Sequence, residues 1–149
     1  MEPIFEREGH VTDTFMNTNN LVTRLIHEYQ EHNNIIVAYD FDDTVCPSKP
    51  TYDCSYVIEL LQELSKLDTI TLICFTCRNG ESDILEIKEF ADSHNFRCDC
   101  INDNSPTLTM DTSRKIFYNI FLEERGGLKT AYEILVRFLD WYYHERKEE

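Results

Sequence analysis

Residues 40–44, Asp-Phe-Asp-Asp-Thr, place three carboxylates and a hydroxyl within five positions. They directly follow an apolar run, 35–39, that is rich in β-branched residues and predicts a buried strand. Side chains alternate faces along a strand, so Asp40 and Asp42 should emerge on the same side at its carboxyl end. Two like charges this close repel each other unless a cation or a hydrogen bond lies between them. The segment therefore predicts a ligand or cation site, although Asp and Thr also suit a polar turn or a helix N-cap.

Polar residues also end two later apolar runs. One run ends at Thr76, a later one ends at the pair Glu123-Glu124, and Lys115 lies one strand length before that pair. In an open α/β sheet, ligands bind outside the carboxyl ends of the strands. A phosphoryl group needs a nucleophile, a hard cation, hydrogen-bond donors and a balancing positive charge. These residue types supply all four, and a cluster of Asp and Glu without His suits Mg²⁺.

Hydrophobic periodicity predicts the elements that would position these residues. Strands are expected at 35–39, 69–75, 96–101 and 116–122, and helices at about 14–32, 56–66, 83–93 and 128–145. Strands that alternate with helices argue for βαβ units and a parallel sheet with right-handed crossovers. Residues 1–13 lack periodicity and are expected to form an irregular arm. A chain of 149 residues without repeats or linkers predicts a single α/β domain over 1–149.

Composition limits the classes of partner. Lys and Arg number 14 against 28 Asp and Glu, so the net charge is −14 and a nucleic acid partner is unlikely. No run approaches the roughly 18 apolar residues that span a bilayer, and no secretory signal is visible. We therefore expect a cytoplasmic protein without a membrane partner, whose six cysteines are reduced.

Four segments resemble the motifs of the haloacid dehalogenase superfamily. Residues 37–45 resemble the first motif, a hydrophobic strand followed by Asp-x-Asp-x-Thr or Val, and 72–76 resemble the second, a strand ending in Thr or Ser. Lys115 resembles the lysine of the third motif, and 121–124 occupy the place of the acidic fourth motif. The resemblance covers about 35–127. It implies a Rossmann-like three-layer sandwich with a small parallel sheet of about four strands in the order 4-1-2-3.

The resemblance also implies an activity, that of a Mg²⁺-dependent phosphatase acting on an unidentified phosphomonoester. Asp40 would attack the substrate phosphorus to form an aspartyl-phosphate. Asp42 would protonate the leaving oxygen and then activate water, because neighbouring carboxylates in different environments can divide these roles. Thr76 and Lys115 would hold the phosphoryl oxygens, with Lys115 also pairing with Asp40.

The implied metal site combines the Asp40 side chain, the Asp42 backbone carbonyl and an acid of the fourth motif, Glu123 or Glu124. The family usually has aspartates at this last position. Glu is one methylene longer, so it could reach the ion directly or through water, although octahedral Mg²⁺ tolerates displaced ligands poorly.

Three further residues are assigned to substrate binding: Asp43, Thr44 and Arg78. Asp43 stands where the family often has Gly and adds a negative charge beside the nucleophile. Arg78 follows Thr76 by two residues and could bind a phosphate bidentately, or could be an ordinary surface arginine.

The spacing of the motifs leaves no room for an inserted cap domain. Only a loop and a helix fit between Thr44 and Thr69, and only a helix, a strand and a loop fit between Thr76 and Lys115. The site should therefore be open, with residues 47–52 as a short flap. Capless members accept small or macromolecular phosphoesters, or borrow a lid from a neighbouring subunit. A homo-oligomer is thus possible, and the aromatic segment 141–143 could serve a subunit contact or pack on its own domain.

Three alternatives remain open. The chain could keep the fold as a catalytically weak module that binds phosphate or Mg²⁺, or that regulates a partner. A phospho-acceptor receiver domain also uses an acidic pair, a hydroxyl and a lysine, but its acceptor would lie on a strand between the pair and the hydroxyl. A zinc or redox site is suggested by Cys74, Cys77, Cys98 and Cys100, although zinc sites want close ligand pairs that project together.

Overall fold

The computed structural model describes residues 14–145, so the expected arm at 1–13 lies outside the described residues. The strands are β1 (Ile35–Tyr39), β2 (Ile70–Cys74), β3 (Cys100–Ile101) and β4 (Ile120–Leu122), and the helices are α1 (Thr18–His32), α2 (Ser55–Ser65), α3 (Glu81–Ser93) and α4 (Leu128–Asp140). A 3₁₀ turn, η3 (Thr14–Met16), precedes α1, and a π-helical turn, η4 (Trp141–Glu145), follows α4. No helix in this described part is long and apolar enough to cross a membrane.

The four strands form one parallel sheet in the order β3-β2-β1-β4, which reads 4-1-2-3 from the β4 edge. The central strand β1 is buried along its whole length, as expected for a continuous apolar strand. Tyr39 is in register with Cys74 of β2 on one side and with Leu122 of β4 on the other. The residues that follow these three strands therefore leave the sheet at the same edge.

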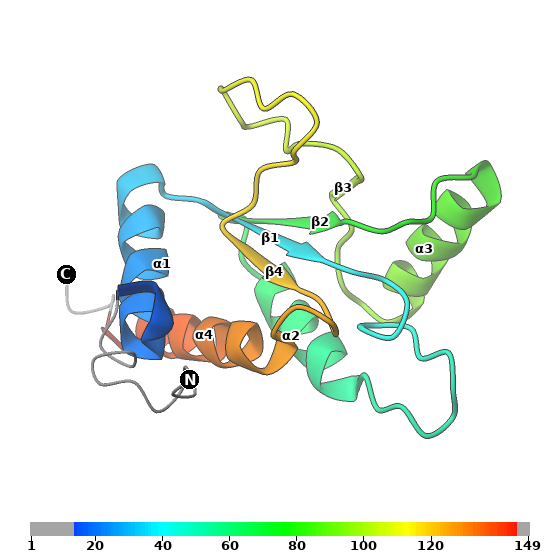
Figure 1. Ribbon diagram of the computed structural model, residues 1–149, viewed down its shortest axis with the longest axis horizontal. Coiled ribbons are helices and arrows are strands. Elements are labelled where there is room, and N and C mark those ends of the chain that lie inside the picture. The colour runs from blue at the N-terminus through cyan, green and yellow to red at the C-terminus, as the bar shows by residue number, and fades with distance from the viewer. Residues whose placement is uncertain (1–13, 146–149) are drawn as a thin grey trace, which may run out of the picture.

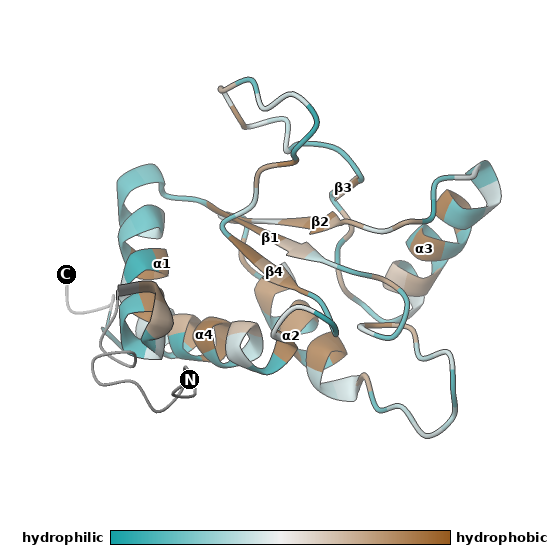
Figure 2. Cartoon of the chain, viewed as in Figure 1, coloured by the Kyte–Doolittle hydropathy of each residue, from teal (hydrophilic) through white to brown (hydrophobic). Residues whose placement is uncertain are grey.

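The two faces of the sheet have different covers. The larger apolar cluster joins one face to α1, α2, α3 and α4, whose brown sides turn toward the strands in Figure 2. On the other face, Ile36, Ala38 and Ile73 pack against Ile116 from the segment 102–119, which contains no helix. Figure 1 shows this segment on the side of the sheet opposite α2 and α4. The expected three-layer sandwich is therefore wrong, because a helical layer is present on one face only.

The direction of the connections accounts for this difference. The steps from β1 to β2 and from β2 to β3 run toward one edge of the sheet, so right-handed crossovers put α2 and α3 on one face. The step from β3 back to β4 runs the opposite way and crosses the other face. The segment that makes this step, 102–119, contains Pro106 and two residues with positive φ, Asn102 and Ser113, so it covers the face without forming a helix.

The edge strands are shorter than the predicted 96–101 and 116–122, because side-chain oxygens replace part of the ladder. The Asp99 amide donates to the Leu72 carbonyl, and the Leu72 amide donates back to Asp99 Oδ2 at 2.8 Å. In the same way, the Asn119 amide donates to the Ile36 carbonyl, and the Ile36 amide donates to Asn119 Oδ1. Both central strands thus have their backbone groups satisfied beyond the regular pairing.

The aromatic C-terminal segment packs on its own domain. The Tyr29 ring of α1 meets the rings of Phe138, Trp141 and Tyr142 at centroid distances of 5.4, 6.0 and 5.8 Å, all edge to face. Such pairs stabilise beyond the area they bury. The segment therefore closes the helical layer between α1 and α4.

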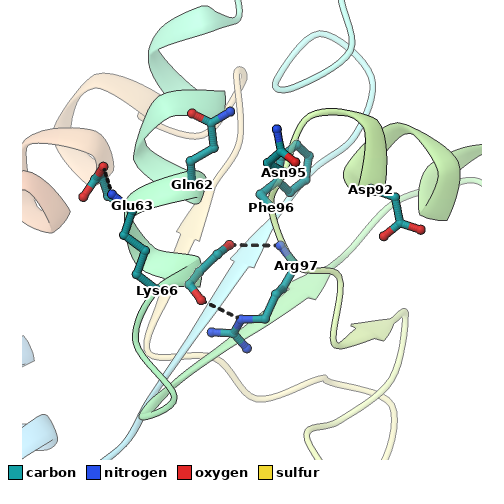
Figure 3. A pocket seen from close by; sticks show the side chains of 8 residues that line it. Gln62, Glu63, Lys66, Asp92, Asn95, Phe96 and Arg97 are labelled. Carbon is teal, nitrogen blue, oxygen red and sulfur yellow. Dashed lines mark hydrogen bonds and ion pairs between the residues drawn. The ribbon is translucent and has the colours of Figure 1, made fainter.

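Arg97 ties the start of β2 to the end of α2. Its guanidinium donates to the carbonyls of Ser65, Leu67 and Ile70 and to Asp99 Oδ2. Figure 3 shows it beside a hollow of about 590 Å³ between the carboxyl ends of α2 and α3. Because these bonds occupy all three nitrogens of the guanidinium, we assign it a structural role.

Replacing Arg97 by Met should lower the free energy of unfolding by about 2–4 kcal/mol, because three backbone carbonyls and a carboxylate lose a charged donor. Urea denaturation measures the change. Arg114→Met is the matched control, since Arg114 is exposed and forms no hydrogen bond or ion pair with the described residues. Equal stabilities of the two variants would contradict the structural role.

Candidate active site

Three carboxylates converge at the carboxyl edge of the sheet. Asp40 follows β1, and Glu123 and Glu124 follow β4; one carboxylate oxygen from each lies within 4.8 Å of the others. The Asp40 amide donates to the Leu122 carbonyl at 3.0 Å, which extends the β1–β4 pairing by one residue and brings the acids together. The predicted meeting of Asp40 with Glu123 and Glu124 is thus present in the structure.

The crowding of these acids changes their affinity for protons. Burial raises the pKa of Asp40 to about 7, aided by a hydrogen bond with Glu124 and by the negative charges of Glu124 and Glu123. Burial and the charge of Glu124 also raise the pKa of Glu123. Burial acts the same way on Glu124, but hydrogen bonds from Thr44 and Asp40 outweigh it and lower the Glu124 pKa. Without a cation, the cluster therefore takes up a proton at a higher pH than an isolated carboxyl group would, most strongly at Asp40.

Thr44 supports Glu124. Its buried hydroxyl donates to Glu124 Oε2 at 2.7 Å and accepts the Glu124 amide at 3.2 Å. Thr44 thus links the loop after β1 to the loop after β4. This contact gives the Thr44 hydroxyl a structural role, the support of Glu124, while its substrate contact stays a prediction.

Asp43 adopts a backbone conformation that favours glycine. Its φ is 63°, in the left-handed region that favours glycine and tolerates Asp. Its Oδ1 accepts the Ser48 amide at 2.8 Å. The hydroxyl and amide of Ser48 lower the pKa of Asp43. In this structure Asp43 therefore anchors the flap that follows it.

Arg78 is paired with Asp42. Its Nη2 and Nε donate to the two carboxylate oxygens of Asp42 at 2.8 and 3.0 Å, and its Nη1 donates to Glu86 Oε2 of α3 at 2.6 Å. The hydrogen bonds that Arg78 donates to Asp42 and Glu86 strongly raise the pKa of its guanidinium. Among the described residues, this is the only Lys or Arg that forms an ion pair with an acid of segment 40–44.

Thr76 lies beside the same cluster, at the end of β2. Its amide donates to Asn102 Oδ1 at 2.8 Å, and its hydroxyl accepts the Arg78 amide at 3.3 Å. Asn102 also donates through Nδ2 to the Arg78 carbonyl at 3.0 Å. Asn102 thus holds both ends of the loop 76–78. The sequence offered only a weak signal for this role, a polar residue directly after the third strand.

The structure does not bring Lys115 to Asp40. Lys115 is exposed and forms no hydrogen bond or ion pair within the described residues 14–145. Lys115 belongs to the segment 102–119, which crosses the second face of the sheet and contains no helix. The pairing implied by the family resemblance is therefore absent from this conformation.

The site opens to solvent on the side of the flap. A hollow of about 540 Å³ adjoins the acidic cluster, and it is lined by Asp43, Thr51, Tyr52, Asp53, Cys54, Glu124 and Arg125. Only the loop 40–54, α2 and the short segment 66–69 separate β1 from β2, so no inserted domain between these strands covers the opening. The four cysteines suggested as a zinc site do not form a metal-sized group among the described residues.

Comparison with known proteins finds no family model, curated protein or solved structure that matches this chain.

Replacing Thr44 by Val should lower the free energy of unfolding by about 1–3 kcal/mol, because the Glu124 amide and carboxylate lose a buried partner without a change in side-chain shape. Urea denaturation tests this, with Thr130→Val as the control at an exposed threonine of α4. If both variants are as stable as the wild type, the Thr44–Glu124 link does not stabilise the loops.

The raised pKa of Asp40 predicts a pH dependence of stability. The carboxyl ionises near 3.8 when unfolded and near 7 when folded, so its favourable contribution is complete below about pH 4 and is lost as the pH rises toward 7. Asp40→Asn should remove this loss, measured as the free energy of unfolding between pH 4 and 8 without divalent metal. Asp68→Asn, at an exposed residue, should keep the wild-type profile. Parallel profiles for all three proteins would contradict the assignment.

Proposed function

We propose that this chain is a Mg²⁺-dependent phosphohydrolase that acts on a phosphomonoester through an aspartyl-phosphate intermediate. The observation that carries the proposal is the convergence of Asp40 with Glu123 and Glu124. Asp40 also precedes Asp42, the proposed proton donor, by two residues. On this proposal the sheet is a Rossmann-like core of the haloacid dehalogenase type without a cap. The motif resemblance supports it from the sequence.

The acidic cluster fits the proposed metal. Its donors are all oxygen, as Mg²⁺ prefers, and they come from three carboxylates within ligand distance of one another. A cation among these carboxylates would offset the repulsion that, in addition to burial, raises the pKa of Asp40. Asp40, Glu123 and Glu124 would hold the ion together with the Asp42 backbone carbonyl. Bound there, Mg²⁺ would neutralise the carboxylates and polarise the phosphoryl oxygens.

The chain's own residues divide the proposed chemistry. An oxygen of Asp40 forms a bond to phosphorus as the ester oxygen leaves and takes a proton from Asp42. A water molecule then attacks the phosphorus while Asp42 accepts its proton. This step releases inorganic phosphate and regenerates the Asp40 carboxylate. Thr76 and Arg78 are the proposed contacts to the phosphoryl oxygens, because both lie in the loop beside Asp42. Lys115 could join them only in a different conformation of 102–119.

The open site suits small or macromolecular phosphoesters, while the net charge of −14 disfavours nucleic acid. A cytoplasmic location and a lid contributed by a second copy remain part of the proposal.

A second candidate is a phosphate-binding or Mg²⁺-binding regulatory module with weak catalysis. Two observations favour it: glutamates stand where the resemblance would place aspartates, and Lys115 is exposed and forms no ion pair with Asp40. Stoichiometric Mg²⁺ binding without turnover of any phosphomonoester would select this candidate over the enzyme.

Replacing Asp40 by Asn should reduce kcat for a phosphomonoester by at least about 10³-fold, because the nucleophile is lost, while the fold is retained. Phosphate release from a substrate panel in Mg²⁺ buffer measures this, and removal of Mg²⁺ by a chelator should abolish the wild-type activity. Asp68→Asn is the charge-matched control and should retain full activity. Wild-type turnover by the Asp40→Asn variant would end the proposal.

A further inference from the structure

The Arg78 guanidinium lies between the site and α3, with an acid on each side. Asp42 occupies Nη2 and Nε, while Nη1 is 2.6 Å from Glu86 and 3.6 Å from Asp83. Both acids on α3 come from its first two turns, and Asp83 also accepts the Gly80 amide. The side of the Arg78 guanidinium away from Asp42 is therefore held by α3.

The rest of Arg78 is held independently of Asp42. Its backbone is bound at the amide by the Thr76 hydroxyl and at the carbonyl by the Asn102 side chain. Its guanidinium carbon lies 5.1 Å from the centroid of the buried Phe41 ring, in a cation–π contact. If Asp42 moved away, these contacts would keep the two donors Nη2 and Nε in the same place.

Asp42 is the freer partner of this ion pair. Its side chain is 46% exposed, against 27% for Arg78, and the guanidinium supplies the two strong hydrogen bonds that hold its carboxylate. A phosphoryl group presents two oxygens to the same fork and carries more negative charge than a carboxylate. A phosphate can therefore take the place of Asp42 on Arg78.

We propose that Arg78 binds the substrate's phosphoryl group by exchanging it for Asp42, and that Glu86 is the positioning residue that holds the guanidinium during this exchange. The inference rests on the proposed function and adds a step to it. Both oxygens of Asp42 are engaged by Arg78 in the free protein, whereas its proposed role requires one of them to face the ester oxygen. Binding of a phosphoryl group thus frees the Asp42 carboxylate, which then takes a proton from solvent and can give it to the ester oxygen.

Calorimetric titration with inorganic phosphate in Mg²⁺ buffer tests the exchange. Arg78→Met should raise the dissociation constant of phosphate about 10- to 100-fold, and Arg78→Lys should recover only part of this because it lacks the fork. Glu86→Gln should raise the dissociation constant and the KM of a phosphomonoester about 2- to 5-fold. Its kcat should stay close to the wild-type value, since Asp40 and Asp42 are unchanged. Glu89→Gln, at an exposed residue on the same helix, should match the wild type in every constant.

The outcomes separate this inference from the proposed function. Turnover with wild-type phosphate affinity in Arg78→Met, or an unchanged KM in Glu86→Gln, would overturn the inference and leave the enzyme standing. Phosphate binding that depends on Arg78 and Glu86, without turnover, would support the anion site and overturn the enzyme. A wild-type protein that neither binds phosphate nor hydrolyses phosphomonoesters would overturn both. Circular dichroism and thermal unfolding of each variant establish that it is folded before these comparisons are made.

Discussion

The parallel pairing of β1 with both β2 and β4 is the constraint on which the candidate site depends. Since Tyr39, Cys74 and Leu122 lie in register across three strands, the residues that follow them must emerge side by side. Like charges would not gather this way without the free energy of the buried strands, and β1 is fully enclosed. The free energy of the apolar core thus offsets the repulsion among the acids at its edge. Burial and this repulsion together raise the pKa of Asp40.

Short polar side chains carry the sheet beyond its regular hydrogen bonds. Asp99 and Asn119 accept amides of the two central strands at the start of the edge strands, and Asn102 accepts the Thr76 amide at the end of β3. Each also donates its own backbone amide to the neighbouring strand. In this way side-chain oxygens extend the hydrogen bonding of the short edge strands, and Asn102 fixes the loop 76–78 at the end of the sheet.

The site joins two groups of charges with different partners. Asp40, Glu123 and Glu124 lie close together, and Thr44 binds Glu124. Asp42 pairs with Arg78, which also contacts the acids of α3. Two neighbouring aspartates therefore have unlike surroundings, one crowded by negative charge and the other paired with a cation. The proposed roles require both to change: a cation would favour the ionised Asp40, and a phosphoryl group would displace Asp42 from Arg78. The difference in surroundings arises because β4 flanks one side of β1 and β2 flanks the other.

Local pattern in the sequence determined the parallel α/β sheet, the helices α1 to α4 and the meeting of Asp40 with Glu123 and Glu124, because continuous apolar runs and helical periodicity are local signals. The tertiary structure decided the rest. The absence of a helix on the second face depends on how 102–119 crosses the sheet, and the missing Lys115–Asp40 ion pair follows from that path. The partners of Arg78 were equally invisible, because α3 and the loop after β1 are far apart in the chain. Long-range packing sets which charges meet, and no short pattern of residues records it.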